Sequence, residues 1–412
     1  MAKLNITLNQ EEILHLLAND RDAAFAALLQ ASLNSILKAE STEQLKAEPY
    51  ERTEERTGSS NGFRERPLTT RIGQITLNVP KHRNGEAFKT LVFDNYCRSE
   101  AALIVTMAEM VVNGVSTRKV SQVMETLCGK SFSKSTVSEA CKNLDDMVKE
   151  FRERPLGSYP FLTIDATYFK VREHSRVISR AFMIAYGTNS EGMREIIGFG
   201  IYNKESKETW NNFLKGLTLR GLQGVRMITS DAHDGIRDAI CKQFPGVPWQ
   251  RCQFHFSRNI IQNTPVKYQH GLAAELQEMF NCKTIEDARK CRDTIIADYT
   301  DVAENAMKCL DEGFEDAMTV MVLPGYLRKY FRTSNQIERL NKELKRRSKV
   351  IGVFPNDESL MRLMGAVLLE RNEAIASLRC VFKVTTYNKI MSSVISAKLV
   401  EIAERQRQLL AA

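Results

Sequence analysis

The sequence has no apolar run approaching the ~20 residues that a membrane-spanning helix needs. Its first residues, Met-Ala-Lys-Leu-Asn-Ile-Thr, lack the apolar centre of a signal peptide. The nine cysteines are odd in number and form no Cys-x-x-Cys pair, which fits a reducing cytosol better than a disulfide framework. No internal repeat or low-complexity tract is present. We therefore expect a cytoplasmic protein with no membrane partner.

A strong excess of one charge is also missing. The 58 Lys and Arg against 50 Asp and Glu give a net charge of +8, which permits a polyanionic partner without requiring one. With 412 residues, 43% of them hydrophobic, the chain can bury a large core and form two or three domains. Where the basic residues gather therefore matters more than their total.

The N-terminal region alternates between helical patterns and polar breaks. Apolar residues recur at spacings of three and four over residues 10–48, which predicts a helix. Residues 49–66 are polar and contain a Gly-Ser-Ser-Asn-Gly breaker, so we interpret them as a linker. Alternating residues around Gly73 predict a small hairpin over 67–80.

Residues 99–150 return to a helical pattern with a break. Ser116 is a suitable N-cap, Gly129 ends the first helix, and Ser133 or Ser135 begins a second. Two helices joined by a Gly-containing turn fit a DNA-binding helix-turn-helix, and an ordinary helical hairpin fits about as well. The basic residues that would contact DNA in the first case are Arg118, Lys119 and Lys134.

The pattern then changes to strands. Residues 161–165, 177–186 and 195–202 predict three strands joined by turn-rich segments, and therefore antiparallel. A helix beginning at Ser206 or Glu205, a strand over 225–230, a helix over 234–243 and an edge strand over 247–252 follow. This β-β-β-α-β-α-β order predicts an α/β fold of the ribonuclease H-like type.

Helical patterns fill residues 256–322, and Leu323-Pro-Gly-Tyr interrupts them before helices over 335–347 and from 357 onward. We thus predict an N-terminal helical region with a linker, a hairpin plus helix-turn-helix region that binds DNA, a ribonuclease H-like catalytic domain, and a C-terminal helical region. Their expected bounds are 1–66, 67–155, 156–355 with an all-helical insertion at about 256–330, and 356–412.

Two aspartates stand at strand positions that favour function. Asp165 lies within an apolar strand that Tyr168 and Phe169 continue, where a carboxylate is costly unless it is paired or binds a metal. Asp231 follows the strand over 225–230, at the edge where α/β sheets bind ligands. Because Asp is also a favoured N-cap, we assign the cap of the next helix to Asp234 and metal binding to Asp231.

Glu338 is the third acid, and it lies early in a helix whose apolar face is Ile337, Leu340 and Leu344. Asn335 and Asn341 flank it at three residues on either side and share its face, so we treat them as site-supporting. An acid beside basic residues on a helix is usually a solvated ion-pair partner. Its catalytic interpretation therefore depends on the other two acids.

Three converging carboxylates predict a metal site. Oxygen ligands favour Mg²⁺ or Mn²⁺, and two such ions in one site can drive in-line displacement at phosphorus. Asp165, Asp231 and Glu338 are thus the predicted catalytic and metal-binding residues. The attacking group would be water for strand cleavage or a DNA 3′-hydroxyl for strand transfer.

Two further motifs surround these acids. Cys252 and His255 form a Cys-x-x-His spacing, for which packing and hydrogen bonding are favoured over a zinc site because no second compact pair is evident. A basic run follows Glu338, and beside a phosphodiester-cutting site we interpret it as a phosphate-contacting surface. Its predicted DNA-binding residues are Arg339, Lys342, Lys345 and Arg346.

Together these motifs resemble the Mutator-like family of bacterial insertion-sequence transposases, which are DDE enzymes. The resemblance runs from Tyr50 to about residue 372. The stretches that carry it begin at Asp165 (Asp-Ala-Thr-Tyr), Ser230 (Ser-Asp-Ala-His-Asp-Gly), Gln250 (Gln-Arg-Cys-Gln-Phe-His) and Arg332 (Arg-Thr-Ser-Asn-Gln-Ile-Glu-Arg-Leu-Asn). Weaker matches begin at Gly114 and at Gly352 (Gly-Val-Phe-Pro-Asn).

The resemblance implies an enzyme that acts on the bacterial nucleoid, recognises terminal inverted repeats, works as a dimer or higher multimer, cleaves a strand and joins its 3′-hydroxyl to target DNA. It also implies a helical insertion between Asp231 and Glu338. Two other functions remain open: a non-catalytic DNA-binding regulator, and a nuclease of similar fold that only hydrolyses.

Overall fold

The structure is a computed structural model. It describes residues 21–47, 51, 53, 56–70, 73–84, 86–90, 101–128, 132–142, 144–391 and 393–411. The chain divides into two compact units, residues 1–143 and residues 144–412, and each is described separately. Within the described part of the chain, no helix is long and apolar enough to span a membrane.

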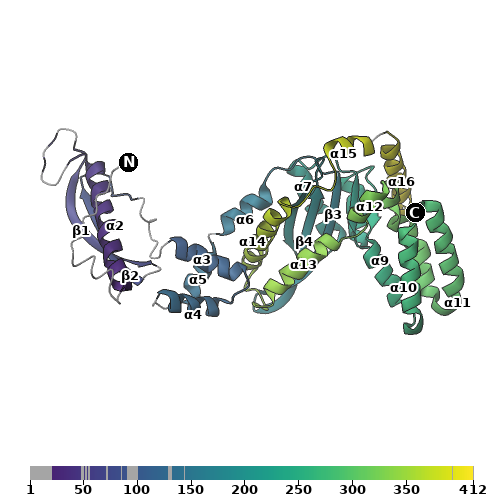
Figure 1. Cartoon of the computed structure of the whole chain (residues 1–412), viewed down its shortest axis with the longest axis horizontal. Helices are drawn as coiled ribbons and strands as arrows, with labels where there is room; N and C mark the ends of the chain where they lie inside the picture. The colour runs from purple at the N-terminus through teal and green to yellow at the C-terminus, as the bar shows by residue number, and fades with distance from the viewer. Residues whose placement is uncertain are drawn as a thin grey trace. The chain divides into compact units, whose positions relative to one another are not determined.

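The first unit begins with a helix packed on a two-stranded antiparallel sheet. Its elements are α2 (Arg21–Leu45), β1 (Ser59–Thr70) and β2 (Gly73–Arg83). The helix lies against the two strands (Figure 1), and Leu37 of α2 packs with Leu68 and Leu77 of the sheet. The hairpin prediction is confirmed, but residues 59–66 belong to β1 and not to a linker. The glycine-rich segment is accommodated by a register shift between Ser60 and Phe63, with Gly62 at φ +72°.

The described residues of this unit also form the helices α3 (Ala101–Val112), α4 (Thr117–Cys128) and α5 (Lys134–Lys142). The two predicted caps are present. The Ser116 hydroxyl accepts a hydrogen bond from Lys119 N at 3.3 Å, and the Ser133 hydroxyl accepts one from Thr136 N at 3.1 Å. Buried Met107, Val120 and Val137 form the core. The predicted end at Gly129 lies outside the described residues.

A five-stranded mixed sheet organises the second unit. It contains β3 (Phe161–Glu173), β4 (Arg176–Thr188), β5 (Arg194–Tyr202), β6 (Met227–Ser230) and β7 (Trp249–Arg251). Their spatial order is β5-β4-β3-β6-β7. The first three strands along the chain pair antiparallel, whereas β6 pairs parallel with β3 and with β7. The five predicted strands, their antiparallel start and the edge position of the last are confirmed, and so is a mixed α/β fold.

Helices cover both faces of this sheet (Figure 1). One face packs on α7 (Lys207–Leu219) and α8 (Asp234–Gln243) through a core that includes Trp210 and Ile236. α7 begins at Ser206, as predicted, with a complete capping box. The other face is covered by α6 (Leu144–Glu153), α12 (Gly325–Phe331), α13 (Asn335–Ser348) and α14 (Asp357–Ala376).

A helical subdomain follows β7, as the sequence predicted. It comprises α9 (Gln253–Gln262), α10 (Val266–Asn281) and α11 (Ile285–Ala317). α11 is interrupted at Ala303, whose backbone is not helical. The Arg289 guanidinium binds the Glu315 carboxylate through two hydrogen bonds, so the two halves of α11 run antiparallel. Phe256, Leu276 and Phe314 fill the core of this subdomain.

The C-terminal helices α15 (Val384–Ile390) and α16 (Ser393–Ala411) return to the sheet. Gln406 of α16 is buried against the edge strand β7. Its side-chain oxygen accepts a hydrogen bond from Trp249 N, and its amide nitrogen donates to Trp249 O, both at 2.8 Å. The amide group therefore pairs with both backbone groups of Trp249, whose carbonyl oxygen also accepts a hydrogen bond from Thr319 Oγ1 at 3.0 Å.

Candidate active site

The sheet register places Asp165 and Asp231 beside each other. Thr163 of β3 pairs with Thr229 of β6 in parallel. Two residues further along each segment come Asp165, still within β3, and Asp231, directly after the end of β6. Because parallel strands advance together, these two carboxylates lie level with each other on neighbouring segments. The early end of β6 opens the sheet beside Asp165.

Helix α13 brings the third predicted acid to this place. Asn341 Nδ2 donates a hydrogen bond to Asp165 Oδ2 at 2.8 Å, which fixes the helix against β3. Glu338 lies three residues earlier, where α13 faces α9. Ile337, Leu340 and Leu344 are buried, as the helical pattern predicted. Asn335, by contrast, begins the helix and is exposed, so it is on the rim of the site.

The two aspartates are held in an environment that resists their ionisation. Burial and then the neighbouring Asp231 charge raise the pKa of Asp165 to about 7. Burial also raises the pKa of Asp231, against the opposing charges of His255 and His233. Two carboxylates buried together repel each other when both are charged. Such a pair is stabilised by a cation placed between or beside them.

Unpartnered oxygen atoms surround the same point. Asp231 Oδ1, Asn341 Oδ1 and Thr167 Oγ1 are buried without a hydrogen-bond partner among the described residues. Buried polar atoms are normally satisfied, so each such acceptor calls for a missing partner. Carboxylate and amide oxygens are the ligands that Mg²⁺ and Mn²⁺ prefer. The donor set of this site therefore fits a divalent cation.

Cys252 and His255 lie against Glu338 through Ser334. The sulfur of Cys252 accepts hydrogen bonds from Ser334 N at 3.3 Å and from Ser334 Oγ at 3.2 Å. Ser334 Oγ also lies 3.2 Å from Glu338 Oε1, and His255 Nε2 lies 3.8 Å from that same oxygen. These contacts connect the Cys-x-x-His pair to the third predicted acid. Ser334, to which the sequence pattern assigned no role, connects all three side chains.

The charges of this group follow from its contacts. The hydrogen bond with Cys252 raises the pKa of His255 to about 9, and the charges of Glu338 and Asp165 add to the effect. Burial raises the pKa of Cys252, but hydrogen bonds from His255 and Ser334 outweigh it and leave that pKa lowered. Ligand atoms of Cys252, His255 and Glu338 lie within 4.8 Å of one another, which is compact enough to hold a metal ion. Structural zinc sites have four ligands, and this group supplies three.

The sequence predicted that Asp234 caps α8, and this prediction is wrong. His233 occupies the N-cap position, and its Nδ1 accepts a hydrogen bond from Gly235 N at 3.2 Å. Asp234 is the first helical residue and is exposed, where a carboxylate favours the positive end of the helix dipole. The error arose because an imidazole nitrogen can replace the usual carboxylate as the cap acceptor. Asp231 is not needed as a cap.

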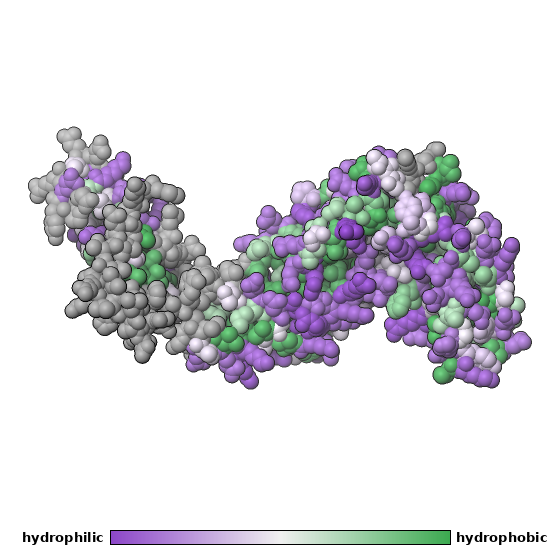
Figure 2. Space-filling model, viewed as in Figure 1, coloured by the Kyte–Doolittle hydropathy of each residue, from purple (hydrophilic) through white to green (hydrophobic). Residues whose placement is uncertain are grey.

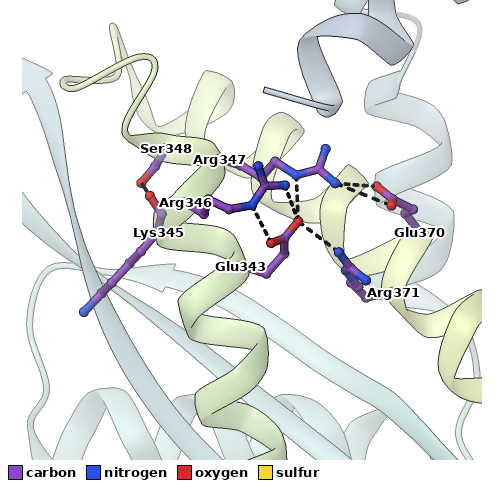
Figure 3. A network of polar contacts seen from close by, with 7 residues as sticks. All are labelled: Glu343, Lys345, Arg346, Arg347, Ser348, Glu370 and Arg371. Atoms are coloured by element: carbon purple, nitrogen blue, oxygen red, sulfur yellow. Dashed lines mark hydrogen bonds and ion pairs between the residues drawn. The ribbon is translucent and has the colours of Figure 1, made fainter. Parts of the chain in front are cut away.

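The basic residues of α13 fall into two groups. Arg339, Lys342 and Lys345 are exposed. Arg346 is also exposed, but it binds both oxygens of Glu343 at 2.8 Å. Arg347 is buried and binds Glu343 and Glu370 (Figure 3). Figure 3 shows Lys345 extending away from this network.

Arg118, Lys119 and Lys134, in the first unit, are exposed on α4 and α5. Their charges are therefore presented to solvent, as a DNA contact requires.

We expect Asp165→Asn to stabilise the metal-free protein. A folded-state pKa of about 7 means that the folded chain keeps a proton which the unfolded chain releases near pH 4. Wild-type stability therefore falls as pH rises from about 4 to about 7, and the variant avoids this loss. In EDTA at pH 8 the gain should be on the order of 2 kcal/mol, and it should vanish below pH 4.

Urea unfolding followed by tryptophan fluorescence measures this gain, because both tryptophans, Trp210 and Trp249, lie in the second unit. Asp234→Asn is the control, since that carboxylate is exposed. A gain that does not change with pH would contradict the assigned burial of the Asp165 charge.

These features define a class of protein, namely a mixed α/β protein with a cluster of carboxylates beside a basic helix. The sequence matches the family described as "Transposase, Mutator family" over residues 1–377. It is 43% identical over 378 residues to the transposase for insertion sequence element IS256 in transposon Tn4001 of Staphylococcus aureus, covering 90% of this chain and 96% of that protein. The chain belongs to the Mutator family of transposases, which confirms the resemblance inferred from its motifs.

Two further relatives span most of the chain. The transposase for ISRM5 of Rhizobium meliloti (strain 1021) is 38% identical over 347 residues, covering 84% of this chain and 87% of that protein. The transposase for IS1081 of Mycobacterium tuberculosis (strain ATCC 25618 / H37Rv) is 36% identical over 348 residues, covering 84% of each. Helix α16 lies beyond the residues that the family match includes.

Proposed function

We propose that this protein is a DNA transposase which binds the terminal inverted repeats of an insertion sequence, cleaves a strand and joins the 3′ end to target DNA. The observation that carries the proposal is the convergence of Asp165 and Asp231 beside α13, which bears Glu338. Family membership supports the same activity. We further propose that the sheet is of the ribonuclease H-like type, which its β5-β4-β3-β6-β7 order supports.

Asp165, Asp231 and Glu338 would hold two Mg²⁺ or Mn²⁺ ions, which supply charge stabilisation for the attacking and leaving oxygens of an in-line phosphoryl transfer. The unpartnered Asp231 Oδ1 and the raised pKa of Asp165 support this assignment. Within the chain, Asn341 orients Asp165 through its 2.8 Å hydrogen bond. Ser334 and His255 constrain the Glu338 carboxylate.

The exposed cations of the protein would bind the DNA backbone. Arg339, Lys342 and Lys345 continue along α13 from the acids, so a strand that enters the site would meet them. Arg118, Lys119 and Lys134 are proposed to contact the element ends through the helix-turn-helix of the first unit. A dimer or higher multimer is proposed because two ends must be brought together.

A substrate with a pre-cleaved 3′-hydroxyl end tests the proposal. A transposase yields joined product from this substrate, whereas a nuclease that only hydrolyses yields shortened strands. A DNA-binding regulator yields neither product while still retarding the end DNA. Omission of Mg²⁺ and Mn²⁺ should abolish joining. Joining that persists in EDTA would contradict the proposed metal dependence.

We expect the double variant Lys342→Ala with Lys345→Ala to bind DNA duplexes of unrelated sequence more weakly, and by a similar factor for each sequence. Removal of one phosphate-binding cation should lower the slope of log K against log salt by about 0.9. The pair should therefore lower it by about 1.8, whereas Arg346→Ala should change it less, because Glu343 already balances that charge. Fluorescence anisotropy in a salt series from about 50 to about 200 mM measures this slope.

Lys290→Ala with Lys308→Ala is the matched control, because both lysines are exposed on α11. An unchanged slope in the α13 variant would remove this helix from the DNA surface.

A further inference from the structure

The Gly352-Val-Phe-Pro-Asn motif lies in a turn that projects two apolar side chains. Val350 and Ile351 follow the end of α13 and are 45% and 39% exposed. They are adjacent, β-branched and preceded by exposed Lys349. A single exposed aliphatic side chain is ordinary on a protein surface. Two at the tip of a turn, next to a row of cations, form a small apolar wedge with a basic flank.

The wedge is held in place from both sides. Ile351 N and Gly352 N both donate to Ser348 O at 3.0 Å, and Gly352 has φ +74°, a conformation that glycine adopts without strain. Phe354 is only 1% exposed. Its backbone N donates a hydrogen bond to Lys170 O at 2.9 Å, and its backbone O accepts one from Arg172 N at 2.8 Å. The turn is thus tied to β3, the strand that carries Asp165.

The position of the wedge relates it to the acids. Val350 comes twelve residues after Glu338, just beyond the end of α13. At 1.5 Å per helical residue this corresponds to about 18 Å. Duplex DNA rises about 3.4 Å per base pair, so a duplex lying along α13 would place the wedge about five base pairs from the phosphate at the acids. Arg339, Lys342 and Lys345 lie between these two points.

We propose that Val350 and Ile351 insert between base pairs of the bound element end and unstack them about five base pairs from the cleaved phosphate. Apolar side chains that enter a base step, supported by basic residues on the phosphates, are a known way of kinking DNA. A second copy of this chain fits the wedge less well, since two side chains bury far less than the roughly 800 Å² per partner of a stable interface. The inference rests on the proposed function, because it takes the element end as the partner and the three acids as the place of cleavage.

The test uses the full-length protein in EDTA and end duplexes that carry 2-aminopurine at single positions three to eight base pairs from the cleaved phosphate. Binding by the wild type should raise fluorescence several-fold at one or two adjacent positions near the fifth. Val350→Ser with Ile351→Ser should remove this rise and leave the salt slope unchanged. Lys342→Ala with Lys345→Ala should lower the slope and retain the rise at saturating protein.

Val266→Ser with Val394→Ser is the matched control, since these side chains are 84% and 63% exposed on other helices, and it should behave as the wild type. Saturated binding without unstacking, or a rise that persists in the wedge variant, overturns the inference alone. A wedge variant that changes the oligomeric state of the free protein also overturns it, in favour of a contact between copies. Absence of DNA binding by the wild type overturns the proposed function together with the inference.

Discussion

Asp165→Asn, Asp231→Asn and Glu338→Gln should each lower cleavage and joining of element-end DNA by about 10³-fold or more, with end binding retained. Each amide keeps the size of the side chain but removes a negative charge from the proposed metal site. A divalent cation supplies several kcal/mol of charge stabilisation to phosphoryl transfer, and each 1.36 kcal/mol removed is a factor of ten in rate. Single-turnover assays of cleavage and of joining, with anisotropy for binding, measure the separation.

Asp234→Asn is the control for this series. It lies three residues from Asp231 and is exposed in the first turn of α8, so its loss should change the rate little. Full activity in any of the three site variants would remove that residue from the catalytic group. Loss of activity together with loss of end binding would indicate a structural role for the residue instead.

Glu343→Ala should lower the free energy of unfolding of the second unit by about 3–5 kcal/mol. Glu343 accepts hydrogen bonds from Arg346, Arg347 and Arg371 (Figure 3). Arg347 is only 3% exposed, so the variant takes an acid 2.8 Å away from a buried guanidinium, while Glu370 stays 3.4 Å from it. Removing one partner of a buried ion pair costs far more than the pair contributes, because the other charge stays buried.

The pH dependence of this effect has a defined sign. Hydrogen bonds from the three arginines, with Arg346 the largest, hold the pKa of Glu343 far below its ordinary value. A lowered folded-state pKa stabilises the fold above the unfolded pKa of about 4.3, and this contribution is lost as pH falls below it. The difference between wild type and Glu343→Ala should therefore be full at pH 7 and shrink in acid.

Urea unfolding followed by tryptophan fluorescence measures the Glu343→Ala effect. Arg346→Ala is the matched control and should cost much less, because that side chain is 60% exposed. Replacing Glu343 and Arg347 together by Leu and Met should recover most of the loss. Equal effects of Glu343→Ala and Arg346→Ala would contradict the role assigned to the buried arginine.

The composition of the surface does not by itself locate the three acids or the arginine network around Glu343. Hydrophilic residues cover much of the coloured part of the face seen in Figure 2, so hydrophilic character alone does not mark a site. Among the cations of α13, exposure separates Lys342 and Lys345 from Arg347, which serves the fold. A DNA surface is therefore expected where exposed cations continue from the buried acids.

The sequence by itself determined the order and type of the elements. Strand-like segments bounded by turn-rich connections predicted β3, β4 and β5, and the spacing of Ile337, Leu340 and Leu344 predicted the buried face of α13, because both patterns depend on local backbone geometry. The caps at Ser116 and Ser206 were predictable for the same reason. The strand over residues 59–66 was missed because its glycine-rich pattern is typical of a loop, and pairing with β2 overrides it.

Only the tertiary structure decided which side chains meet. Asn341 bonds Asp165, and Ser334 joins Cys252 to Glu338, although long stretches of sequence separate the partners. Parallel pairing of β3 with β6 set Asp231 level with Asp165. Local patterns cannot encode such contacts, because they depend on how distant elements pack and on which charges that packing removes from water.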